Sequence, residues 1–215
     1  MKNFLLTIIC FSSLLLSGCA TSTSEISINT EQLTLQNNTQ STKTVFVRNI
    51  IDERKFDPDT NDPSVPSVDY ETEDEKDHAI GRKRNAYGMA LGSIVLTEEQ
   101  TVRGLTRDAI EQALIDNGYN VIKNEKDVTS KTLIVDISIK KFWAWMKPGF
   151  WSITLSNDIV ADINVVNTSK EKQCNIKGEY KEGFQTGTAG NYTKVIQKSF
   201  NRFYLDAKDQ FSKID

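Results

Sequence analysis

The chain has 215 residues, 38% of them hydrophobic, and a formal net charge of −3. A mildly acidic chain lacks the basic footprint that nonspecific nucleic-acid binding needs, so we expect no nucleic-acid partner. Beyond the N-terminal segment, no apolar stretch approaches the roughly 20 residues that a membrane-spanning helix requires.

The first 19 residues have the layout of a bacterial secretory signal. Lys2 is the only charge before Cys19, and an apolar run of about 13 residues between them is too short to span a bilayer. The run ends in Leu16-Ser17-Gly18-Cys19, which resembles the bacterial lipobox. We therefore predict that residues 1–18 are a signal peptide, with cleavage between Gly18 and Cys19 and lipid on Cys19. The alternative is an ordinary signal peptide with an incidental cysteine.

The segment 19–43 is rich in Ser, Thr, Asn and Gln, which is typical of a solvated tether between lipid and domain. Ile26, Ile28, Leu33 and Leu35 could still pair locally as short strand segments. Residues 44–215 are predicted to form a single domain, in which 57–78 is an acidic flexible loop. His78, at the end of that loop, is expected to be solvated and to bind no metal.

Hydrophobic periodicity predicts the regular elements of the domain. Residues 43–50 read as the first strand, and 97–117 as an amphipathic helix that begins with a capping box at Thr97–Gln100 and ends at Gly118. A short strand follows at 120–122. Alternation predicts three further strands over 133–140, 152–165 and 173–184, separated by turns, and then a final helix capped by Asn191.

These elements predict an α+β fold in the order β-α-β-β-β-α. We expect an antiparallel sheet of about four strands, with the two amphipathic helices packed on one face. In this arrangement one face of each strand is buried, which agrees with the alternation of apolar and polar residues along residues 133–165.

Three segments resemble the YajG-like family of bacterial outer-membrane lipoproteins. They are the opening strand 45–54, the glycine-bearing segment 80–88 and the last strand 178–184. The resemblance implies a lipoprotein in the outer membrane that faces the periplasm, and it supplies no catalytic residues. Ala20 agrees with this location, because an Asp after the lipidated cysteine favours inner-membrane retention in lipoproteins of the enteric type. The acidic insert 57–78 departs from the family pattern.

One basic cluster follows the acidic loop and consists of Arg82, Lys83 and Arg84. Arginine can bind phosphate with two parallel hydrogen bonds, so the cluster could bind a lipid headgroup or lipopolysaccharide. The alternative is local charge balance with the acidic run.

An aromatic cluster surrounds the Lys147-Pro148-Gly149 turn. Trp143 and Trp145 continue the apolar parity of their strand, whereas Phe150 and Trp151 lie at the turn. Large aromatic side chains serve both as core and as binding surface. The cluster is therefore either core or a binding edge for a partner, an acyl chain, a sugar or the membrane interface.

The residues provide no recognisable catalytic, metal or cofactor site. Cys174 is the only cysteine that remains once Cys10 leaves with the signal and Cys19 is lipidated, so we expect a small buried hydrophobe and no disulfide. Asp158 and Asp162 are expected to face solvent without forming an acid/base pair.

The sequence therefore predicts a lipid-anchored, non-enzymatic cell-envelope protein that binds or assembles a protein or glycolipid partner. A subunit of the lipopolysaccharide-assembly type is an alternative that rests on element order alone. The competing class is an envelope hydrolase, which would need a nucleophile or an acid/base pair that the sequence does not reveal.

Overall fold

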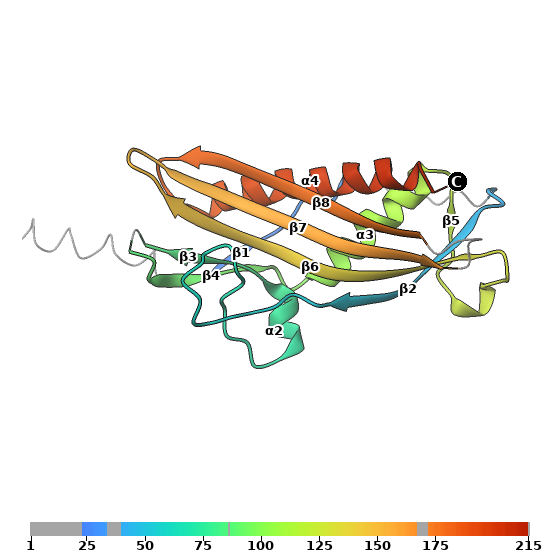
Figure 1. The fold of residues 1–215 in the computed structure, drawn as a ribbon, viewed down its shortest axis with the longest axis horizontal. Coiled ribbons are helices and arrows are strands. Elements are labelled where there is room, and N and C mark those ends of the chain that lie inside the picture. Colours follow the sequence, from blue (N-terminus) through green and yellow to red (C-terminus); the bar gives the residue numbers. More distant parts are fainter. Residues whose placement is uncertain (1–22, 34–39, 86, 167–171, 215) are drawn as a thin grey trace, which may run out of the picture.

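The computed structural model describes residues 23–33, 40–85, 87–166 and 172–214. Gly18, Cys19 and the predicted signal peptide lie outside this range. The described part is an α+β fold built on an eight-stranded mixed sheet (Figure 1). Its strands are β1 (Ser24–Ile26), β2 (Thr44–Asp52), β3 (Ala79–Arg84), β4 (Ala90–Leu96), β5 (Asn120–Val121), β6 (Leu133–Pro148), β7 (Ile153–Val166) and β8 (Lys172–Phe184). Its helices are α2 (Glu73–His78), α3 (Val102–Asp116) and α4 (Ala189–Phe211), with a 3-10 turn at Glu125–Asp127.

The prediction of a four-stranded antiparallel sheet is wrong. Within the described residues, four of the seven strand pairings are parallel, those of β1 with β4, β2 with β5, β2 with β6 and β3 with β6. The meander β6–β7–β8 is antiparallel as predicted. Strand β2, the first strand that the sequence predicted, pairs with β6 in parallel. Helix α3 lies between the two strands in the chain, and a helical crossover of that kind returns the chain to the end of the sheet at which β2 began.

Strand β6 organises the sheet because one of its edges serves two partners. Val45 to Asp52 of β2 pair with the first half of β6, and Gly81 of β3 pairs with Ala144 in the second half. The other edge of β6 pairs with β7 along nearly its whole length. The sheet is therefore continuous through β8–β7–β6 and divides beyond β6 into a β2–β5 arm and a β3–β4–β1 arm.

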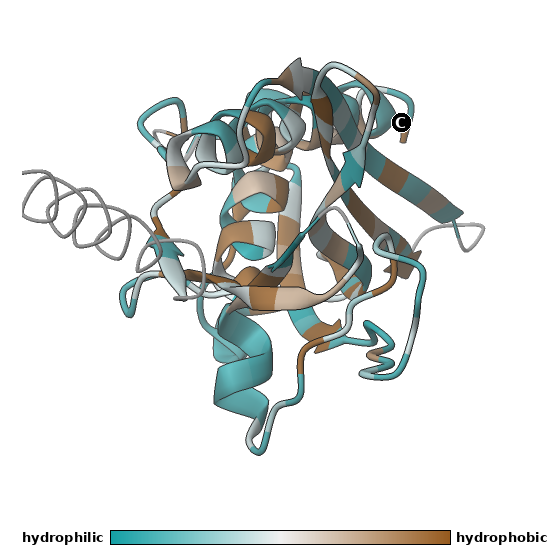
Figure 2. Cartoon of the chain, turned by 90° about the vertical axis from the view of Figure 1, so that its left-hand side faces the viewer, coloured by the Kyte–Doolittle hydropathy of each residue, from teal (hydrophilic) through white to brown (hydrophobic). Residues whose placement is uncertain are grey.

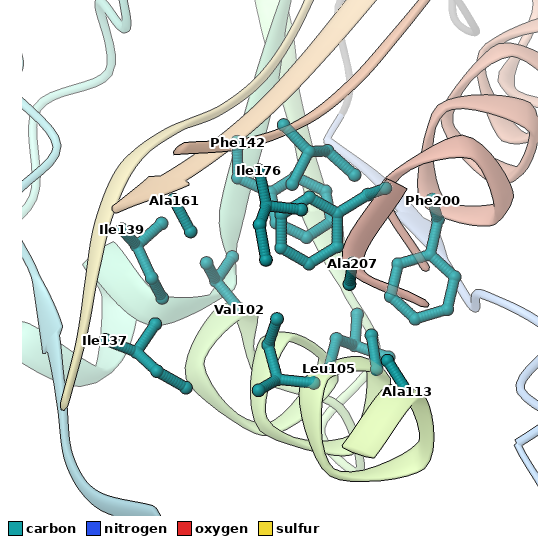
Figure 3. Packing of buried hydrophobic residues seen from close by; sticks show 14 of the residues in the cluster. Val102, Leu105, Ala113, Ile137, Ile139, Phe142, Ala161, Ile176, Phe200 and Ala207 are labelled. Carbon is teal, nitrogen blue, oxygen red and sulfur yellow. The ribbon is translucent and has the colours of Figure 1, made fainter. Parts of the chain in front are cut away.

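Helices α3 and α4 contact each other and cover one face of the sheet, as predicted. Figure 3 shows the apolar core between them, where Leu105 of α3 and Phe200 of α4 lie opposite Ile139, Phe142 and Ile176 of the sheet. All five side chains are at most 3% exposed. No helix among the described residues is long and apolar enough to cross a membrane.

Helix α3 starts later than the sequence suggested. Thr97–Gln100 forms a turn, and the N-cap is Thr101, whose hydroxyl accepts a hydrogen bond from the backbone N–H of Gly104 at 2.9 Å. The side chain of Gln100 bonds instead to both backbone groups of Ile28. Gly118 follows the helix with φ +82°, the left-handed conformation expected of a helix terminator.

Part of the segment predicted to be a tether belongs to the folded body. Ser24–Ile26 adds strand β1 to the edge of the sheet beside β4, and Ile28 and Leu33 are 1% and 8% exposed. Ile26 pairs with Leu96 of the distant strand β4, and Ile28 and Leu33 are buried outside any strand, so these apolar residues join the core without pairing locally. Leu35 lies outside the described residues.

Candidate functional site

The face of the sheet opposite α3 and α4 carries most of the residues that the sequence singled out. A β-bulge lies between Ile139 and Lys141 of β6, where the register with β7 shifts. An extra residue in a strand reverses which face the following side chains occupy. Phe142 therefore joins the helix-covered core, and Trp143 faces the other side, so the expectation that Trp143 and Trp145 continue the parity of Ile139 is wrong.

Trp143 is nevertheless fully buried, because the chain that follows β2 folds over it. Its indole N–H donates to the carbonyl of Pro63 at 3.1 Å. Its ring lies edge-on to Phe56 with centroids 6.0 Å apart, and Phe56 in turn meets Tyr70 at 5.0 Å. These rings form a second, smaller core that fixes the loop 53–72 on the outer face of the sheet.

Trp145 is 8% exposed and lies under the Lys141 ammonium, 4.6 Å from the ring centroid. Lys141 also pairs with Asp158 at 2.8 Å, so this carboxylate is held by a neighbouring strand. Phe150 and Trp151, in contrast, are 89% and 82% exposed at the β6–β7 turn. The predicted aromatic cluster is thus divided between two buried and two exposed side chains.

The basic cluster lies in strand β3, which the sequence did not predict. The guanidinium of Arg82 donates to the carbonyl of Ser67, and that of Arg84 donates to the Ser67 hydroxyl and to the carbonyls of Thr60 and Gly88. Lys83 is 8% exposed. In this structure the two arginines hold the loop 57–70 through its backbone, and neither forms an ion pair with the acidic run.

The end of the predicted acidic loop is a helix. Residues Glu73–His78 form α2, with Thr72 as N-cap, and the Thr72 hydroxyl and the Glu75 carboxylate bond reciprocally to each other's backbone N–H. Thr-Glu-Asp-Glu is a capping-box pattern, so the signal was present in the sequence but was masked by the run of acidic residues. Figure 2 shows α2 as the hydrophilic helix projecting at the bottom.

Arg54 fastens α2 to the point where the sheet divides. Its side chain is fully buried and forms a bidentate ion pair with Asp52 at the end of β2. It also donates to the carbonyls of Ala79, Phe142 and Lys76, at 2.7, 3.2 and 2.6 Å. Backbone carbonyls at a split in a sheet need other partners when the ladder is interrupted, and this guanidinium supplies them.

The C-terminal half of α2 is tied to α3 as well. Asp77 is 4% exposed, and its carboxylate accepts from the backbone N–H of Arg103 at 2.9 Å and from the Arg103 guanidinium at 2.8 Å. Arg103 is in the first turn of α3, where backbone N–H groups have no partner inside the helix. The Asp77 carboxylate thus supplements the Thr101 cap.

Helix α2 and the preceding residues enclose a groove against the edge of the sheet. The groove has a volume of about 360 Å³. Its apolar part is contributed by Val68, Tyr70, Ala79 and Val95, and its carboxylates by Glu25, Asp69, Asp74, Glu75 and Glu98. The loop, α2, β1, β3 and β4 all contribute, so residues from distant parts of the chain meet here.

His78 lies on the wall of this groove as the last residue of α2, with its side chain 18% exposed. Its Nδ1 donates to the carbonyl of Asp74 at 2.8 Å. The sequence placed His78 at the end of a solvated loop, and the structure makes it part of a helix. In the part of the chain that the structure describes, no group of three or more His, Cys, Asp or Glu is arranged to hold a metal ion.

Cys174 is half-buried in β8, and desolvation, followed by the charges of Asp206 and Asp162, raises the pKa of its thiol to about 11. We expect thiol reagents to react with the folded mature chain at pH 7 at least about tenfold more slowly than with the unfolded chain, because only the thiolate attacks. The rate should rise with pH between 7 and 9. Alkylation followed by mass spectrometry, with Cys174→Ser as control, checks this; equal rates in both states would contradict it.

Comparisons with known proteins give similarity at the level of solved structures only. A scan against family models finds no match, and no curated protein matches the sequence. An uncharacterized protein of known crystal structure aligns over 90% of this chain and 99% of its own, at 8% identity and a TM-score of 0.45. Protein XCC0632 from Xanthomonas campestris, of family DUF330, covers 89% and 91%, at 6% identity and a TM-score of 0.40. The hypothetical protein CT253 from Chlamydia trachomatis covers 79% and 95%, at 8% identity and a TM-score of 0.32. The chain is thus structurally similar to uncharacterized bacterial proteins.

Proposed function

We propose that this protein is a lipid-anchored, non-enzymatic binding module of the bacterial outer membrane. Its ligand-binding site is the groove between α2 and the β1–β4 edge. Its ligand is a segment of a partner protein that carries both basic and apolar side chains. The observation that supports this proposal is the combination of an apolar floor with a rim of carboxylates in one groove of about 360 Å³.

The charge of the groove favours a protein partner over a glycolipid. Five carboxylates line it, and the described residues of its lining include no Lys or Arg. Phosphate-bearing glycolipids are anionic and would meet like charge there, which costs binding free energy. Lysine or arginine side chains would meet opposite charge at the rim while neighbouring apolar side chains contact Tyr70 and Val95.

The anchor and the location in this proposal come from the lipobox and from the resemblance to the YajG-like family. The alternative of a lipopolysaccharide-assembly subunit was based on the order β-α-β-β-β-α. The described order contains four additional strands and one additional helix, so that alternative loses its support.

Binding of a labelled peptide that alternates lysine and leucine tests the groove directly. Fluorescence anisotropy should give saturable binding to the mature lipidated chain, and a peptide that alternates glutamate and leucine should not bind. The double variant Asp74→Lys/Glu98→Lys should weaken binding by about tenfold, since each reversal turns attraction into repulsion at a solvated site. Added salt should weaken binding as well.

A matched control is the double variant Asp127→Lys/Asp209→Lys, which changes net charge equally at exposed positions outside the groove. It should leave the affinity nearly unchanged. Equal losses in the two double variants would reduce the interaction to nonspecific charge attraction. Stronger binding of lipopolysaccharide than of the peptide to the native chain would exclude a basic protein partner as the ligand.

A further inference from the structure

Four large apolar side chains project into solvent from two turns. Tyr87 and Met89 in the β3–β4 turn are 90% and 61% exposed, and Phe150 and Trp151 in the β6–β7 turn are 89% and 82% exposed. The Phe150 and Trp151 rings meet edge to face with centroids 4.8 Å apart. Single exposed apolar residues are ordinary, but several on neighbouring turns mark a contact surface.

Strand pairing places the two turns at the same end of the sheet. Strands β3 and β6 run parallel with Gly81 opposite Ala144, so both strands point the same way when they reach Arg84 and Pro148. The turns that follow them both lie at the left-hand end in Figure 1, and Figure 2 looks onto that end.

The N-terminus of the described body leaves toward this same end. Strand β4 starts at the β3–β4 turn, and β1 runs parallel to it with Ser24 opposite Ile94. Ser24 therefore lies four strand positions, about 13 Å, back from the start of β4. The five residues from Cys19 to Ser24 can span about 17 Å. A lipid on Cys19 can therefore reach the level of the turns.

The charge of this end also differs from that of the whole protein. The net charge of the chain is −3, yet the stretches 79–96 and 137–157 contain no Asp or Glu. Together they carry six basic residues, of which Arg82, Lys83, Arg84 and Lys147 directly precede the two turns. Lys140 and Lys141 lie farther back on β6 and pair with Glu53 and Asp158. Basic residues near exposed aromatic rings suit the headgroup region of an anionic bilayer.

We propose that this end of the sheet is a membrane-contacting surface, formed by Tyr87, Met89, Phe150 and Trp151. The inference rests on the proposed lipid anchor, which holds the two turns at the bilayer, where these side chains enter the boundary between headgroups and acyl chains. The lipid holds the protein at the bilayer, and contacts by the protein's own side chains fix its orientation there. In this orientation the β3–β4 and β6–β7 turns face the membrane.

Tryptophan fluorescence can test this orientation because Trp143 and Trp145 are buried and Trp151 is exposed. The lipidated mature chain is reconstituted into vesicles of phosphatidylethanolamine and phosphatidylglycerol, with and without brominated acyl chains. The brominated lipids should cause a loss of the Trp151 emission, and acrylamide in the water should no longer quench it. The variant Trp151→Phe measures the remaining signal of the two buried rings.

The double variant Trp151→Phe/Leu205→Trp supplies the matched control, since Leu205 is 58% exposed on α4 and away from the turns. Its added indole should be quenched by acrylamide and not by brominated lipid. The inference is overturned if Trp151 stays open to acrylamide on the vesicles, or if the Leu205→Trp indole is quenched by lipid as strongly as Trp151. Mass spectrometry of the mature chain separates the two proposals: absence of lipid on Cys19 removes the anchor itself, whereas lipid with a water-exposed Trp151 removes only the membrane contact.

Discussion

Arg54→Met is expected to lower the free energy of unfolding by about 3–5 kcal/mol, the range found when one partner of a buried ion pair is removed. The substitution leaves the Asp52 carboxylate, 3% exposed, without its guanidinium. It also removes the donors from the carbonyls of Ala79, Phe142 and Lys76 at the division of the sheet. Urea denaturation measures the change as a lower midpoint.

Arg48→Met is the matched control for this prediction. Arg48 lies on β2, the strand that ends at Asp52, and also binds an aspartate with two hydrogen bonds, but its side chain is 46% exposed and that of Asp136 is 25% exposed. Exposed ion pairs contribute little to stability, so the midpoint should stay close to that of the native chain. Equal effects of the two substitutions would show that the buried Arg54–Asp52 pair contributes no more to stability than the exposed Arg48–Asp136 pair.

The double variant Asp52→Asn/Arg54→Met should lose less stability than the sum of the single variants, because the two residues share one interaction. The Arg54→Met substitution should also destabilise helix α2 beside the groove. Arg54 holds the backbone of Lys76 in α2, so hydrogen exchange in α2 should accelerate in Arg54→Met before the core strands exchange.

Gly178→Ala is expected to destabilise the protein by about 3 kcal/mol, at the upper end of the usual cost of overpacking. Helix α4 crosses β8 so closely there that a methyl group would lie 2.6 Å from both the backbone nitrogen and Cβ of Phe203, and still closer to the carbonyl oxygen of Ser199. These are backbone or near-backbone atoms, which cannot rotate away. The helix itself would have to move off the core that contains Phe200.

Gly183→Ala, five positions along the same strand, separates this steric effect from strand propensity. The nearest heavy atom to its added methyl group would be 3.9 Å away, which is ordinary contact. Thermal unfolding should therefore show a clear decrease in Tm for Gly178→Ala and almost none for Gly183→Ala. A similar Tm for both variants would mean that α4 can shift at little cost.

Elements with clear periodicity could be predicted from the sequence, and those without it could not. The β6–β7–β8 meander and helices α3 and α4 repeat apolar residues at strand or helix spacing over ten residues or more. Strands β3 and β4 were missed because Gly81, Gly92 and three adjacent basic residues conceal their alternation. Their strand character comes from pairing with each other and with β6.

The candidate groove could not be predicted from the sequence, for a different reason. Glu25 and Val95 lie 70 positions apart and meet only because β1 pairs with β4, and Asp74 joins them only because Arg54 and Asp77 fix α2. No single stretch carries the pattern of an apolar floor with an acidic rim. The long acidic run was visible, but it concealed both the capping box of α2 and the groove beside it.

The sequence by itself determined the local features of this protein: the lipobox pattern, the α+β class, the antiparallel meander and the two helices on one face, because each depends on residues close together in the chain. The tertiary structure alone decided the division of the sheet at Arg54, the opposite faces of Phe142 and Trp143, and the shared end of the two exposed turns. A one-residue bulge reverses every side chain that follows it, and strand order depends on pairing between distant segments. Neither leaves a periodic signal in the amino-acid sequence.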